Sequence, residues 1–147
     1  MEPVLITEKV ALIRLGVSLV LGALIGAERR IHNHPAGSRT FMLICMGATL
    51  ATLASIYICQ TNPNLLNGDP GRIAAQILTG IGFIGAGLII KGNDGVSGLT
   101  TAACIFMAAV IGVAVGVGML LVASAVTVVV VLILWSSYVS KKSGSDS

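Results

Sequence analysis

The sequence predicts an all-α protein, a polytopic membrane bundle of five transmembrane helices with its N-terminus outside and its C-terminus in the cytoplasm. Its 147 residues are 55% hydrophobic and only 10% charged. Residues 96–138 contain no Asp, Glu, Lys, Arg or His, although about 20 apolar residues suffice to cross a bilayer. The 18 glycines also suit membrane helices, whose backbones pack closely.

Charged or turn-rich segments divide the chain into five apolar stretches. Asp69-Pro70 predicts the start of the third helix, with Asp69 as the N-cap and proline at the first helical position. A very short turn is expected near Gly116–Gly118. Residues 1–140 form the predicted transmembrane domain, and 141–147 a short disordered cytoplasmic tail. The predicted helices are approximately Glu8–Ala27, Thr40–Cys59, Gly71–Ile90, Leu99–Val115 and Val117–Tyr138.

The distribution of positive charge predicts the orientation of these helices. Lysine and arginine prefer the cytoplasmic side of a membrane protein. One side of the predicted bundle carries six of them, Arg29, Arg30, Arg39, Lys91, Lys141 and Lys142. The other side carries three, Lys9, Arg14 and Arg72. The richer side is therefore predicted to face the cytoplasm.

Small residues recur about every four positions along most of the predicted helices, a pattern that allows close backbone approach. A homodimer through a face such as Gly22–Gly26 stays open as an alternative to packing inside one bundle. The glycines expected to pack helices are Gly22, Gly26, Gly80, Gly82, Gly85, Gly87, Gly112 and Gly116.

A faint internal similarity relates the first two predicted helices to the next two. Ile-Gly-Ala occurs at 25–27 and at 84–86, and Gly-Ser-Arg-Thr at 37–40 resembles Gly-Leu-Thr-Thr at 98–101. This is either a parallel duplication, which would relate the two helix pairs by a pseudo-two-fold axis, or the chance agreement that a Gly/Ala-rich chain allows.

Polar residues near helix ends form the candidate functional cluster. Glu28 and Arg39 are expected to form a charge-assisted pair that closes the inner loop. Arg14 either extends to the outer interface or faces the bundle beside Arg72 and Gln76. The cluster comprises Glu28, Arg29, Arg39, Thr40, Arg72, Gln76, Thr100 and Thr101.

Several function classes lack support in the sequence. Aspartate and glutamate occur only near the ends of predicted spans, and we find no nucleotide-binding motif and no catalytic Ser/His/Asp set. We therefore predict neither enzymatic activity nor a cofactor or metal site. Basic residues are not interleaved with aromatic ones, so no nucleic-acid partner is expected. Two hypotheses remain: regulation of another membrane protein, and transport by a small oligomeric ion or solute channel.

The order and spacing of several motifs resemble the MgtC/SapB family over roughly residues 10–125. They are LGALIGAER at 21–29, PAGSRT at 35–40, GRIAAQI at 71–77, GIGFIGAG at 80–87 and GLTTAA at 98–103. The resemblance implies a multi-pass protein of the bacterial inner membrane with about five spans. Every residue of the candidate cluster lies within these motifs.

The resemblance also implies adaptation to low Mg²⁺ or survival in a host, which is a virulence trait. The mechanism it implies is regulation of a membrane partner complex such as ATP synthase. Many relatives continue into a cytoplasmic ACT-like domain, and we expect this chain to be a short form without it. The expected partners are the lipid bilayer, another membrane protein or complex, and a second copy in a homodimer.

Overall fold

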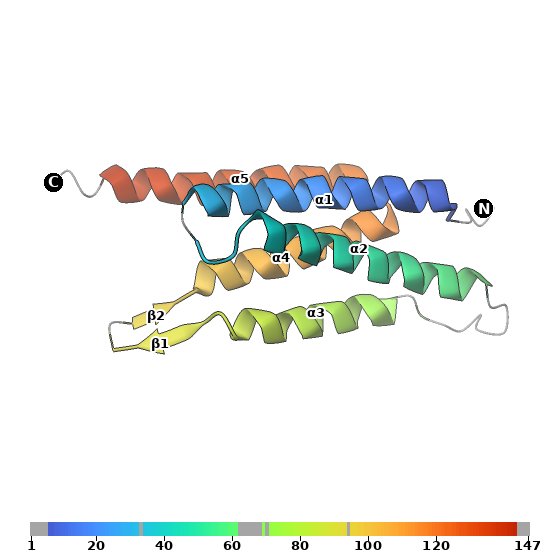
Figure 1. The fold of residues 1–147 in the computed structure, drawn as a ribbon, viewed down its shortest axis with the longest axis horizontal. Coiled ribbons are helices and arrows are strands. Elements are labelled where there is room, and N and C mark those ends of the chain that lie inside the picture. The colour runs from blue at the N-terminus through green and yellow to red at the C-terminus, as the bar shows by residue number, and fades with distance from the viewer. Residues whose placement is uncertain (1–5, 33, 62–68, 70, 94, 144–147) are drawn as a thin grey trace.

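The computed structural model describes residues 6–32, 34–61, 69, 71–93 and 95–143. Five helices and one β-hairpin form an elongated bundle, with the two chain ends at opposite ends of it (Figure 1). The elements in chain order are α1 (Glu8–Ile31), α2 (Ser38–Thr61), α3 (Gly71–Ala86), β1 (Ile90–Gly92), β2 (Gly95–Ser97), α4 (Leu99–Val117) and α5 (Leu120–Ser143).

The predicted all-helical fold is confirmed for all five helices, whose direction alternates along the chain (Figure 1). Three of them, α1, α2 and α4, are long and apolar enough to cross a membrane. The apolar helix α3 is shorter, and so is the described apolar part of α5. Helix α5 continues to Ser143, and residues 144–147 of the predicted tail lie outside the described residues.

The two ends of the bundle differ in the segments that they contain. The hairpin end contains the C-terminal end of α1, the start of α2, the β-hairpin and the start of α4 (Figure 1). The opposite end, which we call the Arg14 end, contains the start of α1 and of α3 and the turn between α4 and α5.

Helix starts and stops follow the local sequence. The Asp69 side chain accepts a hydrogen bond from the Gly71 backbone N–H at 2.8 Å, which confirms the predicted N-cap, while Pro70 lies outside the described residues. The predicted turn after α4 is also present. Gly118 ends that helix with a left-handed φ of 99°, and its N–H donates to the Val115 carbonyl at 3.0 Å.

The β-hairpin was not predicted. Helix α3 ends at Ala86 rather than Ile90, because the chain turns and pairs Ile90 with Ser97 in antiparallel register. Gly95, at the start of β2, has a φ of 126°, a conformation that favours glycine. The missed signal is a Gly-Asn-Asp-Gly segment between short strand-forming sequences.

Helix α4 contacts all four other helices, and α2 contacts α1, α3 and α4. A Cβ atom at Gly22 would lie 2.6 Å from the Phe41 carbonyl oxygen, and one at Gly26 would overlap Ser38. Further along α2, Gly112 of α4 faces Cys45 and Gly116 faces Thr52. Glycine is therefore needed at these positions for α1 and α4 to approach α2 so closely.

The remaining predicted packing glycines have other surroundings. Gly85 is buried, and a Cβ there would make ordinary contact with Ala102 at 3.7 Å. Gly87 faces carbonyl oxygens at the end of its own helix. Nothing lies within 4 Å of a Cβ built at Gly80 or Gly82. These two glycines are open on the surface of the single chain.

Replacing Gly112 with alanine should lower the free energy of unfolding by about 1–3 kcal/mol, the usual cost of overfilling a packed interior. Its Cβ would lie 2.8 Å from the Ala48 Cβ and closer still to the Cys45 carbonyl oxygen. Circular dichroism during SDS titration of the detergent-solubilised protein measures this. The matched control is Gly16→Ala on α1, where a Cβ meets nothing within 4 Å. Equal stability of both variants would contradict the packing described.

Candidate functional site

A buried ion pair lies in the last turns of α1, at the hairpin end. Glu28 and Arg29 are only 5% and 4% exposed. The Arg29 Nε donates to Glu28 Oε2 at 2.5 Å, and its Nη2 donates to Glu28 Oε1 at 3.0 Å. Burial of either charge alone would cost several kcal/mol, so the two side chains stabilise each other in place.

His32, the residue that follows α1, completes this cluster four positions after Glu28. Its Nδ1 lies 3.0 Å from Glu28 Oε1 and 2.9 Å from the Glu28 backbone oxygen. Since both neighbours are acceptors, Nδ1 carries the hydrogen. We call Glu28, Arg29 and His32 the α1 charge cluster. The structure thus pairs Glu28 with Arg29 and His32, not with the predicted partner Arg39.

The other predicted site residues are divided between the two ends of the bundle. At the hairpin end, Arg39, Thr40 and Thr100 are exposed, whereas Thr101 is buried at the start of α4. Arg72 and Gln76 lie on the exposed surface of α3, towards the Arg14 end. The eight residues therefore do not form one site within a single chain.

Arg14 faces the bundle but contacts a different element from the one expected. Its Nη1 donates to the Gly116 carbonyl oxygen at 2.7 Å, and the guanidinium lies beside Gly118. The Gly116 carbonyl belongs to the C-terminal end of α4, where the helix dipole favours a cation. Arg14 thereby connects α1 to the α4–α5 turn, and not to Arg72 or Gln76.

Sequence reasoning also missed the hydroxyl groups in the core. The Thr49 Oγ1 lies 2.8 Å from the Gly112 carbonyl oxygen and 3.0 Å from the Cys45 carbonyl oxygen. It therefore joins α2 to α4. Thr52 and Thr127 donate to carbonyls of their own helices at 2.8 Å. No spacing rule identifies these residues, since a threonine that bonds its own helix needs no partner in the sequence.

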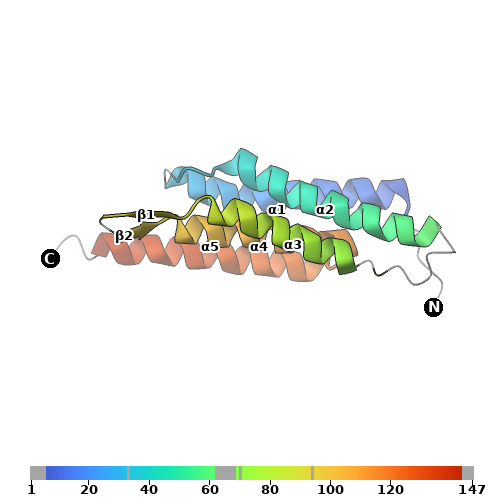
Figure 2. The same ribbon diagram turned by 90° about the horizontal axis from the view of Figure 1, so that it is seen from below.

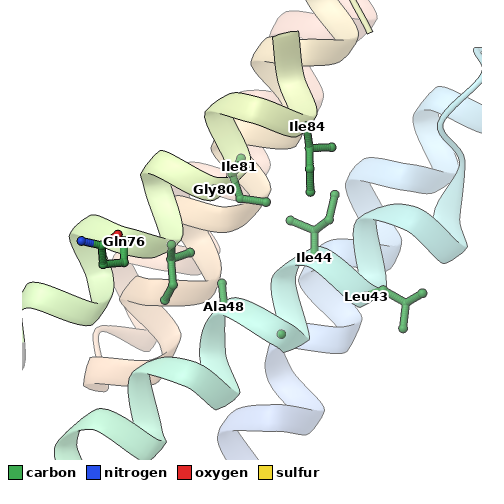
Figure 3. Close-up of a pocket in the computed structure, with 9 residues that line it drawn as sticks. Leu43, Ile44, Ala48, Gln76, Gly80, Ile81 and Ile84 are labelled. Atoms are coloured by element: carbon green, nitrogen blue, oxygen red, sulfur yellow. The ribbon is translucent and has the colours of Figure 1, made fainter. Parts of the chain in front are cut away.

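An open groove of about 440 Å³ runs between α2 and α3 (Figure 3). Gln76 is the only polar side chain among the described residues that line it, and Ile44 and Ile84 extend towards each other from the two helices. The lining residues are Leu43, Ile44, Gly47, Ala48, Gln76, Ile77, Gly80, Ile81 and Ile84. Among the described residues, no group of three or more His, Cys, Asp or Glu side chains is placed to hold a metal ion.

These features define a membrane protein built as a helical bundle, with a buried charge cluster at one end and glycine-packed helices at its centre. The MgtC family model matches residues 15–142, and the chain belongs to this family.

Several relatives are similar over most of this chain. SapB of Bacillus subtilis is 43% identical over 110 residues, which are 73% of this chain and 47% of that protein. MgtC of Salmonella typhimurium LT2 is 44% identical over 119 residues, 81% of this chain and 48% of its own. YhiD of Escherichia coli K12, which is named a putative magnesium transporter, is 44% identical over 110 residues. These residues are 74% of this chain and 51% of that protein.

The chain thus spans about half the length of these relatives. No solved structure matches it.

Replacing Glu28 with glutamine should destabilise the protein by about 3–5 kcal/mol, because it leaves the Arg29 charge buried without a counter-ion. SDS titration followed by circular dichroism measures the change. The double variant Glu28→Leu with Arg29→Met should recover most of the loss, since it removes both charges.

The control for the Glu28 variant is Arg39→Gln, which alters an exposed arginine. It should change stability by less than about 0.5 kcal/mol. If Arg39→Gln lowered stability as much as Glu28→Gln, the result would support the predicted Glu28–Arg39 pair and contradict the α1 charge cluster.

Replacing Arg14 with leucine should increase hydrogen exchange at the backbone amides of Gly118 and Met119. The reason is that the Gly116 carbonyl loses a charge-assisted hydrogen bond, worth on the order of 1–3 kcal/mol. Mass spectrometry of the detergent-solubilised protein measures the exchange. The exposed residue Lys9 provides the control variant, Lys9→Leu. Unchanged exchange in the Arg14 variant would mean that this contact does not hold the turn.

Proposed function

We propose that this protein is a multi-pass protein of the bacterial inner membrane. All five helices cross the bilayer, with the hairpin end in the cytoplasm. The alternating helix directions and the exposed apolar side chains support the five crossings. The basic residues at the hairpin end support the orientation. Arg30, Arg39 and Lys91 are exposed there, as the positive-inside rule requires.

Helix α3 is the shortest crossing. Its 16 residues span about 24 Å at 1.5 Å per residue, less than the roughly 30 Å of hydrocarbon. The apolar residues Leu88 and Ile89, which follow α3, extend the crossing towards the hairpin. The remaining mismatch is met by local thinning of the bilayer or by association with another helix.

Within that membrane, we propose that the protein regulates a partner complex and supports adaptation to low Mg²⁺ or survival in a host. The observation that carries this proposal is the state of its buried polar groups. Thr49, Thr52 and Thr127 are bonded to backbone carbonyls, and Glu28 is paired with Arg29. Because these groups are engaged within the packed bundle, the surface is what the protein offers to other molecules.

The partner that the family resemblance suggests is a membrane complex such as ATP synthase. Contact through helix surfaces within the bilayer suits this chain, because α1, α3 and α5 expose large apolar side chains. The exposed arginines at the hairpin end suit contact with acidic groups on the cytoplasmic side of such a complex.

A second candidate function is transport by an oligomer, which the name of the relative YhiD favours. Arg14 is engaged by the Gly116 carbonyl oxygen. A path would therefore run along the exposed surface of α3, past Arg72 and Gln76, and several copies would have to enclose it.

Purified protein reconstituted in liposomes separates the two functions. Regulation predicts Mg²⁺ flux equal to that of protein-free liposomes, and the same value for Arg72→Ala. It also predicts that a membrane complex co-purifies with the tagged protein after cross-linking in native membranes. Flux in the wild type that Arg72→Ala abolishes would contradict regulation and establish transport.

A further inference from the structure

We propose that two copies of this chain associate through α3, each copy placing its α3 in the α2–α3 groove of the other. The proposal concerns the surface that Figures 1 and 2 show at the outside of the bundle. It goes beyond the proposed function, because self-association does not depend on any other partner.

Helix α3 is poorly buried in the single chain. Of its 16 residues only Gly85 is buried, whereas α4 has nine buried residues among 19. Phe83 is 84% exposed and Ile84 48%. A short membrane helix is also mismatched to the thickness of the bilayer. Association through α3 would bury its exposed side chains and reduce this mismatch.

Two related grooves of the bundle differ in that one is filled by α5 and the other is open. The pairs α1–α2 and α3–α4 have the same direction and order, α2 contacts α4, and each pair's first helix packs on the other pair's second. Helix α5 packs against α1 and α4. If the two pairs are exchanged, α3 takes the place of α1 and α2 takes the place of α4. The position that α5 occupies against α1 and α4 then corresponds to the open groove between α3 and α2. One helix position of the bundle is therefore filled and its counterpart is open.

The surface formed by α3 and the α2–α3 groove is complementary to itself. Gln76, Gly80 and Phe83 lie on one face of α3 at helical spacing. Phe83 projects outwards, and Gly80 with Gly47 of α2 leaves a hollow, since a Cβ at either glycine meets nothing within 4 Å. Two copies related by a two-fold axis along the membrane normal place Phe83 of each against the hollow of the other.

Gln76 identifies a second copy, rather than lipid, as the occupant. Its side chain is exposed, and within the described part of the chain its amide has no hydrogen-bond partner. Lipid tails offer none either. The two-fold axis brings the Gln76 side chains of both copies to the same depth, where each amide can donate to the other and accept from it. Interhelical bonds of this kind stabilise membrane helix pairs.

Fluorescence energy transfer between two labelled populations in liposomes, measured against protein-to-lipid ratio, tests the proposal. The wild type should dimerise. Gly80→Leu and Gly47→Leu should abolish transfer by filling the hollow, where a Cβ meets nothing within 4 Å in the single chain. The matched control Gly16→Leu, at an equally open glycine on α1, should keep wild-type transfer. Gln76→Leu should weaken the dimer about three- to tenfold.

Absence of transfer in the wild type at high protein-to-lipid ratio would overturn the proposal. So would undiminished transfer in both Gly80→Leu and Gly47→Leu. Circular dichroism of every variant separates loss of the dimer from loss of the fold. With Cys45, Cys59 and Cys104 replaced by alanine, a Gly80→Cys variant should also form a disulfide-linked dimer on oxidation in membranes, which Gly16→Cys should not.

Discussion

The close approach of α1 and α4 to α2 is the constraint on which the rest of this bundle depends. Gly22 and Gly26 on α1, and Gly112 and Gly116 on α4, leave no room for a side chain. In lipid, where burial from water provides no driving force between helices, such contacts hold a bundle together by van der Waals attraction. Thr49 adds a hydrogen bond between α2 and α4 at the same level of the bundle.

The charges at the two ends of this packed centre have different roles. At the hairpin end, Arg29 and His32 satisfy the carboxylate of Glu28 inside the protein, while Arg30 and Arg39 stay exposed. At the other end, Arg14 connects α1 to the Gly116 carbonyl in the last turn of α4. The exposed arginines are thus available to partners or anionic lipid, whereas Glu28, Arg29 and Arg14 serve the fold.

Composition, hydrophobic length and turn residues were sufficient to predict five helices, the Asp69 cap and the Gly118 turn, because each depends on local chemistry. The sequence did not show which glycines pack inside the chain. Gly22 and Gly80 look alike in a spacing pattern, yet one touches Phe41 and the other is open. The partner of Glu28 was also misassigned, since an adjacent arginine in a helix seldom folds back onto its neighbour. The family resemblance, by contrast, was sufficient to identify the family.

Single cysteines at Lys9 and Asn93, both exposed, test the proposed five crossings and the cytoplasmic hairpin end directly with a membrane-impermeant maleimide. They are introduced into a variant whose Cys45, Cys59 and Cys104 are replaced by alanine. In spheroplasts the Lys9→Cys variant should react at once, and the Asn93→Cys variant only after the membrane is permeabilised. Reaction of both variants before permeabilisation, or of Asn93→Cys alone, would contradict the account.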